Sequence, residues 1–331
     1  MPILKRVLSL LLRISVSVLL LWLVFRQLDR AIFIEVIKNV DKRLILLAFF
    51  VFFINYVLGI FRWEMLLKAA QIHIPLSRVI ISSAGGQFFS LFLPSTIGGD
   101  VVRVIDLTTH TRKPHEVMAT VLLDRLSGYA GLVILTWLAL LFGWKLVPNK
   151  NVLIWVGILT IILIAVLLAL FNKILYSKIN MFLHSPSGNK IRGYIRDVHK
   201  EIHIFRHHER VALNNIILSI FIQMVTPLTF YITALSLGLK INMIYFFIFM
   251  PIIGAITLLP ISIGGLGLRE YTTRLFFASL GVSAHMSFAM SLVNSFFILI
   301  YGGIGGLIYV LTVHHRRVQY HPPHHLQKIH A

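Results

Sequence analysis

Six ionisable side chains lie within or beside apolar stretches of this sequence: Asp100, Arg103, Asp124, Arg125, Arg269 and Glu270. A charge inside a membrane segment costs roughly 2.5 to 3.5 kcal/mol on insertion scales, so such residues usually pair or face a polar cavity. Arginine suits phosphate in particular, because its planar guanidinium donates two parallel hydrogen bonds. The chemistry that these residue types favour is the binding of an anion within a bilayer.

Some of these charges belong to a pattern that occurs twice, in residues 93–103 and again, 166 residues later, in residues 259–269. Both copies read Leu-Pro, a hydroxyl residue after one further position, Ile-Gly-Gly and, after three further positions, Arg. Proline ends an incoming helix because it has no amide donor, and paired glycines permit backbone angles that other residues resist. We therefore predict that the chain reverses inside the membrane at each copy.

The helix that begins after each reversal offers free backbone amides, a hydroxyl group and an arginine about two turns further on. Together these groups could receive an anionic headgroup. We predict no catalytic, cofactor-binding or metal-binding residue. The predicted substrate-binding residues are Thr96, Gly98, Gly99, Asp100, Arg103, Asp124, Arg125, Ser262, Gly264, Gly265, Arg269 and Glu270.

A purely structural role for the charges is the alternative. Asp100 could only neutralise Arg103, and Glu270 could only neutralise Arg269 or Arg274, which would pin the hairpins in place. Asp124 and Arg125 begin an apolar stretch, where pairing at the membrane interface is common. The uncharged Gln87 and Asn294 are expected to form hydrogen bonds between helices.

The elements that must position these groups are apolar helices. Of the 331 residues, 57% are hydrophobic and 13% are charged, and the mean hydropathy is +0.85, so lipid is the main solvent. A helix needs about 20 apolar residues to cross a bilayer. Such runs occur at 8–25, 44–61, 117–142, 152–171, 211–235 and 284–311. The sequence predicts an all-α polytopic membrane protein with about six full spans and two broken, re-entrant helical hairpins.

The distribution of Lys and Arg predicts the orientation. The long polar segment, residues 172–210, holds eight Lys or Arg against three acids, which indicates a cytoplasmic location. With both termini also cytoplasmic, the first hairpin (79–116) opens from the cytoplasm and the second (243–280) from outside. The two halves, about 1–142 and 152–311, then form an inverted repeat, as in many secondary transporters.

Polar segments interrupt and follow this single transmembrane domain of residues 1–313. Apolar residues at helical spacing between 191 and 205 predict an interfacial amphipathic helix within the cytoplasmic segment. Histidines at 199, 203 and 207 could bind metal, but we interpret them as part of a wet basic face. The His-rich basic tail, residues 314–331, is expected to be a disordered anchor.

The net charge of +19 does not indicate nucleic-acid binding, because the basic residues lie between apolar spans rather than on a polar module. An anionic membrane surface accounts for them. The sequence contains no Cys, which excludes disulfides and thiolate chemistry. Neither Gly-rich turn has the strand or the Gly-Lys-Ser/Thr ending of a nucleotide loop, so we expect no ATPase activity.

Several motifs extend this interpretation. They are residues 86–89 (Gly-Gln-Phe-Phe), 98–100 (Gly-Gly-Asp), 124–128 (Asp-Arg-Leu-Ser-Gly), 260–270, and 61–63 (Phe-Arg-Trp). They resemble the flippase-like membrane family, which includes the membrane region of lysylphosphatidylglycerol synthetases. The resemblance covers nearly the whole chain.

The resemblance implies translocation of anionic phospholipids or lipid-linked intermediates, such as lipid-linked saccharides. The basic internal loops, and the lack of a cleavage site after the first apolar run, predict a location in the cytoplasmic (inner) membrane. In the family's aminoacyl-lipid synthases, a soluble acyltransferase domain follows the membrane portion and makes the lipid. Here the sequence ends soon after Val313, so we do not expect the synthase activity.

Two other functions remain open at this point. The chain could be a membrane enzyme of lipid or lipid-linked glycan synthesis, with Asp100, Asp124 or Glu270 as general acid or base. It could also be a scaffold for a separate lipid-modifying enzyme. Glycines in the last span allow close helix packing, within one protomer or in a homodimer.

Overall fold

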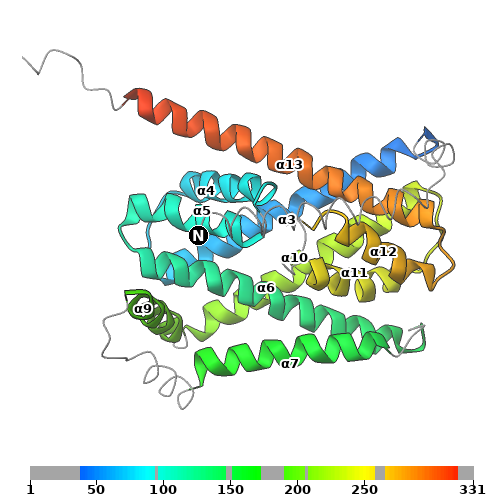
Figure 1. Cartoon of the computed structure of the whole chain (residues 1–331), viewed down its shortest axis with the longest axis horizontal. Coiled ribbons are helices and arrows are strands. Elements are labelled where there is room, and N and C mark those ends of the chain that lie inside the picture. The colour runs from blue at the N-terminus through cyan, green and yellow to red at the C-terminus, as the bar shows by residue number, and fades with distance from the viewer. Residues whose placement is uncertain are drawn as a thin grey trace, which may run out of the picture.

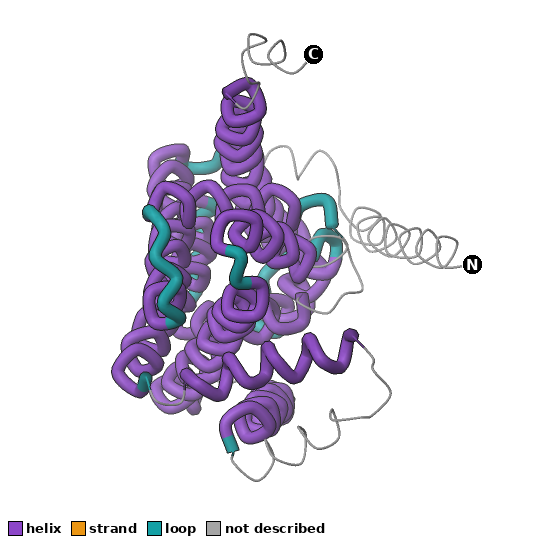
Figure 2. Tube along the Cα trace, turned by 90° about the vertical axis from the view of Figure 1, so that its left-hand side faces the viewer, coloured by secondary structure: helices purple, strands orange, loops and turns teal. Residues whose placement is uncertain are grey.

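The computed structural model describes residues 38–93, 96–146, 151–172, 190–205, 208–257 and 265–319, and every regular element in these ranges is a helix (Figures 1 and 2). Five described helices are long and apolar enough to cross a membrane. They are α3 (Lys42–Ala69), α6 (Pro114–Gly143), α7 (Asn151–Phe171), α10 (Glu209–Ser236) and α13 (Ala284–Gln319). They confirm the helices predicted at 44–61, 117–142, 152–171, 211–235 and 284–311. The predicted span at 8–25 lies outside the described residues.

Helix α3 packs along α10, and α10 in turn packs against α6. The Asp41 side chain caps the start of α3 by accepting a hydrogen bond from the Arg43 amide at 2.8 Å. The helix continues eight residues past the predicted end of its apolar run, because Trp63, Leu66 and Leu67 bury one face of the polar end. This extension keeps Arg62 inside a helix instead of in an interfacial loop.

Each predicted interruption separates two helices that are too short to cross a bilayer. Helices α4 (Leu76–Ser90) and α5 (Thr96–Thr111) flank the first, and α11 (Met243–Thr257) and α12 (Leu268–Ala278) flank the second. At 1.5 Å per residue such helices are about 16 to 24 Å long, which is short of the roughly 30 Å hydrocarbon core. The two pairs lie toward opposite ends of the long axis in Figure 1.

The paired glycines of the first copy serve close packing rather than the predicted chain reversal. Gly98 and Gly99 lie in the first turn of α5, and a Cβ on Gly99 would collide with the carbonyl oxygen of Gly86 on α4. In the second copy, by contrast, Gly265 and Gly267 have φ values of +76° and +79°. Glycine adopts this region readily, so only the second copy uses its glycines for the turn itself.

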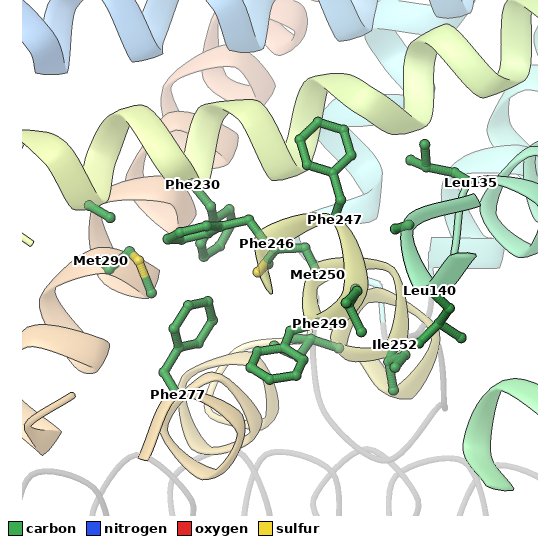
Figure 3. Packing of buried hydrophobic residues seen from close by; sticks show 14 of the residues in the cluster. Leu135, Leu140, Phe230, Phe246, Phe247, Phe249, Met250, Ile252, Phe277 and Met290 are labelled. Carbon is green, nitrogen blue, oxygen red and sulfur yellow. The ribbon is translucent and has the colours of Figure 1, made fainter. Parts of the chain in front are cut away.

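Helix α11 is buried among its neighbours, although its composition would suit lipid. The Phe246 and Phe277 ring centroids are 5.0 Å apart, and Phe249 meets Phe277 edge-on at 5.6 Å. Figure 3 shows these rings between Phe230 of α10 and Leu140 of α6. Within lipid such packing rests on van der Waals and ring contacts, and each aromatic pair contributes about 0.5 to 1.5 kcal/mol, so this cluster anchors the second hairpin.

Helix α7 lies at the periphery and exposes most of its apolar side chains, as expected of a lipid-facing helix. Helix α9 (Lys190–Ile204) packs against α6 and α7 and buries Val198 and Ile202, which confirms the predicted amphipathic helix. The interpretation of its histidines as a wet face is wrong for His199, which is 6% exposed. His199 faces the last turn of α7, and residue 207 lies outside the described residues.

The predicted tail begins inside a helix. Helix α13 continues to Gln319, so the first residues of the segment 314–331 are helical. Residues 320–331 lie outside the described part of the chain.

Candidate functional site

Five charged residues from three helices meet beside the break between α4 and α5. We call them the Arg/Asp network: Arg62 of α3, Asp100 and Arg103 of α5, and Asp124 and Arg125 of α6. The packing of α5 and α3 on α6 brings them together.

Each of the four carboxylate oxygens in the network accepts a hydrogen bond from a guanidinium group. Asp124 accepts from Arg62 Nε at 2.8 Å and from Arg103 Nη2 at 3.3 Å. Asp100 accepts from Arg103 Nη1 at 3.2 Å and from Arg125 Nε. Arg103 therefore bridges both aspartates.

The network is largely removed from solvent. The Asp124 side chain is 7% exposed and the Arg103 side chain 14%. The Arg103 guanidinium carbon lies 3.9 Å from the ring centre of fully buried Trp63, which is a cation–π contact. Arg62 also donates to Ser219 Oγ of α10 at 3.2 Å.

Formal charges do not cancel in the Arg/Asp network, because three guanidinium groups share two carboxylates. Among the described residues, one positive charge of this network is therefore uncompensated. Arg103 Nε is buried and has no hydrogen-bond partner among the described residues. A buried donor without an acceptor is costly, and a phosphate oxygen would satisfy it.

At the second break, Glu270 is fully buried and ties the start of α12 to α13. Its Oε2 accepts from the Gly267 amide at 2.7 Å, and its Oε1 accepts from Ser295 Oγ at 2.7 Å and from Ser291 Oγ at 3.3 Å. Glu270 makes no ion pair with Arg269 or Arg274 in the described structure, so the structural alternative of mutual neutralisation is wrong here.

Arg269 donates to Ser295 Oγ at 3.3 Å and has no acidic partner at ion-pair distance among the described residues. A Cβ on Gly265 would lie 3.4 Å from Arg269 Nη2, so the guanidinium lies against the backbone of the break. This leaves most of its donors available at the start of α12.

Polar side chains line the central helices between the two breaks. Gln87 of α4 donates to Tyr56 Oη of α3 at 3.2 Å, and Tyr56 lies close enough to Arg269 for electrostatic interaction. Asn294 of α13 donates to Thr233 Oγ1 of α10 at 3.2 Å. The predicted interhelical roles of Gln87 and Asn294 are confirmed.

A second buried pair of charges lies between the arms of the first hairpin. Arg78 of α4, 7% exposed, contacts the His110 ring of α5, and His110 Nδ1 lies 2.7 Å from the carbonyl oxygen of Asp106. The Asp106 side chain is also buried. Arg78 and Asp106 offset each other in charge.

The structure thus distributes the predicted binding residues over both breaks. Asp100, Arg103, Asp124 and Arg125 join one network, Gly98 and Gly99 support the contact of α5 with α4, and Gly265, Arg269 and Glu270 form the start of α12. The side chain of Thr96 is not described, and Ser262 and Gly264 lie outside the described residues. No group of three or more His, Asp or Glu in the described structure could hold a metal ion.

Sequence reasoning missed Arg62, Trp63, Ser219 and Tyr56 as members of the site. Arg62 follows the end of an apolar run, where arginine usually faces the headgroups. The Phe-Arg-Trp motif at 61–63 was the available signal, because it belongs to the family resemblance. Ser219 and Tyr56 left no signal, since their roles depend on which helices become neighbours.

Comparison with known proteins agrees with this architecture. The profile of the family described as the lysylphosphatidylglycerol synthase TM region matches residues 10–306. A UPF0104 membrane protein of Pyrococcus horikoshii is 25% identical over 313 residues, which cover 88% of this chain and 92% of the relative.

Proposed function

Because the chain belongs to the family of the lysylphosphatidylglycerol synthase TM region, we propose that it translocates anionic phospholipids or lipid-linked intermediates across the membrane. The observation that carries the proposal is the surplus of one guanidinium group in the buried Arg/Asp network. An unsatisfied positive charge within a membrane protein favours an anionic ligand, and guanidinium groups bind phosphate well.

The arrangement of the two breaks supports movement between two sides. The first hairpin lies at the same end of the molecule as α9, and the second lies at the opposite end (Figure 1). With the basic α9 in the cytoplasm, Arg103 would serve a headgroup from the cytoplasmic leaflet and Arg269 one from the outer leaflet. Acyl chains would remain in lipid beside the exposed helices.

The packing also supports an inverted repeat of α3 to α6 and α10 to α13. Helix α4 of the first unit packs on α13, the last helix of the second. Helix α11 of the second unit packs on α6, the last helix of the first. Each hairpin therefore contacts the final span of the other unit, as a two-fold relation requires, and rocking of one unit on the other would expose the breaks alternately.

The enzyme alternative has weaker support. All four oxygens of Asp100 and Asp124, and both of Glu270, already accept hydrogen bonds. A general base must lie within hydrogen-bond reach of the substrate proton that it removes, and these buried carboxylates are instead oriented toward donors within the protein. The scaffold alternative, a cytoplasmic location of the termini and a homodimer remain expectations.

The test is transfer of labelled phosphatidylglycerol between the leaflets of sealed proteoliposomes. We expect the Arg103→Gln, Arg269→Gln double variant to lose transfer by about tenfold or more, the effect of about 1.4 kcal/mol. In this variant Asp124 keeps Arg62 and Asp100 keeps Arg125, so both aspartates remain paired. Its thermal unfolding should therefore stay close to that of the wild type.

Arg274→Gln is the matched control. Arg274 shares α12 with Arg269 but is half-buried, five residues further on and next to exposed Leu275, so transfer should be unchanged. Equal loss in the control and the double variant, or full transfer in the folded double variant, would contradict a role for the two breaks.

A further inference from the structure

We propose that the site selects by charge, and that it takes a headgroup with one negative phosphodiester charge in preference to a doubly charged pyrophosphate. The lipid nature of this ligand rests on the proposed function, but the charge preference rests on the residues of the site alone.

The charge preference follows from the number of charged side chains at the two breaks. Positive charges come from Arg62, Arg103, Arg125 and Arg269, and negative charges from Asp100, Asp124 and Glu270. Four positive charges against three negative charges leave one. The chain segments between the paired helices, residues 94–95 and 258–264, contain no ionisable side chain, so they do not alter the balance.

Other buried charges do not change this surplus of one positive charge. Arg78 and Asp106 lie between α4 and α5 and cancel each other. Arg274 is only half-buried, five residues beyond Arg269 on α12 and next to Leu275, which is 53% exposed, so we do not count it among the buried charges. Among the described residues, the breaks together therefore hold a single surplus positive charge.

The surplus lies at the first break. Arg269 and Glu270 balance each other formally at the second, whereas the Arg/Asp network has three cations and two anions. The orphaned donor, Arg103 Nε, is also in this network. The geometry points to the first break as the resting position of the phosphate, with one oxygen facing Arg103 Nε.

Electrostatics then decides between ligands. A charge in a site of low dielectric is stable only when it is compensated. A phosphodiester brings the site to neutrality, whereas a pyrophosphate adds one negative charge that nothing there balances. Arg269 does not offset the second charge, because it belongs to the second break, where Glu270 balances it formally.

The experiment measures equilibrium binding of two short-chain lipids to the purified full-length chain in detergent. The probes are dihexanoyl phosphatidylglycerol, with one charge, and the cytidine diphosphate ester of dihexanoylglycerol, whose pyrophosphate has two. We expect the wild type to bind the first at least about tenfold more tightly.

Two variants separate charge from headgroup size. Asp100→Asn raises the surplus to two and should shift the preference toward the pyrophosphate by about tenfold. Asp100→Asn with Arg125→Gln removes a complete ion pair, restores a surplus of one and should restore the wild-type preference. This double variant is the matched control for damage at position 100.

The possible outcomes assign failure to one proposal or the other. A lipid preference that changes with the surplus charge of each variant, without transfer in proteoliposomes, would support charge selection and reject translocation. If the wild type transfers lipid but the wild type and both variants show the same preference between the two probes, charge selection is rejected and translocation is not. A wild type that binds neither probe, or binds both equally, also overturns the inference.

Discussion

At the scale of single residues, the two breaks use carboxylates in different ways. Asp100 and Asp124 accept from guanidinium groups, whereas Glu270 accepts from a backbone amide and two serine hydroxyls. Glu270 therefore acts as a structural cap for α12, because its carboxylate accepts from the amide of the N-cap residue Gly267. This role explains why it leaves Arg269 unpaired.

Glu270→Gln should lower the stability of the protein by about 1 to 3 kcal/mol. The glutamine side chain lacks the negative charge that strengthens three buried hydrogen bonds. Its NH2 group also cannot accept a hydrogen bond from the serines or from the backbone amide of Gly267. Thermal unfolding in detergent measures the change.

The control for this substitution is Glu64→Gln. Glu64 pairs with the exposed Lys68 at 2.8 Å one turn along α3, and such pairs contribute about 0.5 kcal/mol or less. If the two variants lose the same stability, Glu270 contributes no more to the stability of the protein than a carboxylate on the surface does.

At the scale of elements, the first hairpin depends on backbone contact between α4 and α5. Gly99→Ala should destabilise the protein by about 1 to 3 kcal/mol, because the added methyl group meets the Gly86 carbonyl. Gly59→Ala on α3 is the control, since its methyl group has nothing within 4 Å and alanine favours a helix. Thermal unfolding of both variants gives the comparison, and a tolerated Gly99→Ala would mean that the helices separate easily.

The docking of α9 on α7 should depend on pH. His199 Nε2 lies 3.3 Å from the Ala169 carbonyl and His203 Nδ1 3.4 Å from that of Leu170, two carbonyls in the last turn of α7 that lack intrahelical partners. Burial lowers the pKa of His199 below its ordinary value of 6.5. The undocked segment therefore binds the proton more readily, and the stability of docking is present above pH 6.5 and lost as the pH falls through and below that value.

Hydrogen exchange measures this prediction. We expect faster exchange of α9 amides at pH 5.5 than at pH 7.5, after correction for the intrinsic rate. His199→Asn keeps a hydrogen-bond donor but does not titrate, so its α9 should show the same protection at both values. A wild type that behaves like the variant would rule out His199 as the responsive group.

At the scale of the whole molecule, each hairpin contacts the final span of the other unit, and these contacts should move during translocation. The chain has no Cys, so pairs can be introduced cleanly. Leu91, which directly follows α4, and Gly302 of α13 lie against each other, as do Ile244 of α11 and Gly143 of α6. A disulfide formed between cysteines at the two positions of either pair should stop transfer, and its reduction should restore transfer.

Single-cysteine variants serve as controls for that experiment, because they cannot form an internal disulfide. Full transfer by both oxidised pairs would mean that the hairpins stay fixed on the opposite spans. The mechanism of alternating exposure would then fail.

The sequence predicts the spans and the breaks well, since hydropathy, Pro and Gly act locally. It predicts Asp100, Arg103, Asp124 and Arg125 as charged residues that need partners. It does not predict that Arg62 bridges to Asp124, because that contact requires the packing of α3 on α6. Likewise, Glu270 next to Arg269 suggests an ion pair, and only the approach of α13 gives Glu270 its serine partners.

The stacking of Arg103 on Trp63 also gives the molecule an internal optical reporter. Trp63 is fully buried, whereas Trp137, Trp144 and Trp155 are 45%, 60% and 49% exposed. In a Trp22→Phe variant, collisional quenchers dissolved in lipid or water reach those three indoles and leave the emission of Trp63. A headgroup that draws the guanidinium away from the ring would change the remaining fluorescence, so occupancy of the Arg/Asp network can be followed in the unlabelled protein.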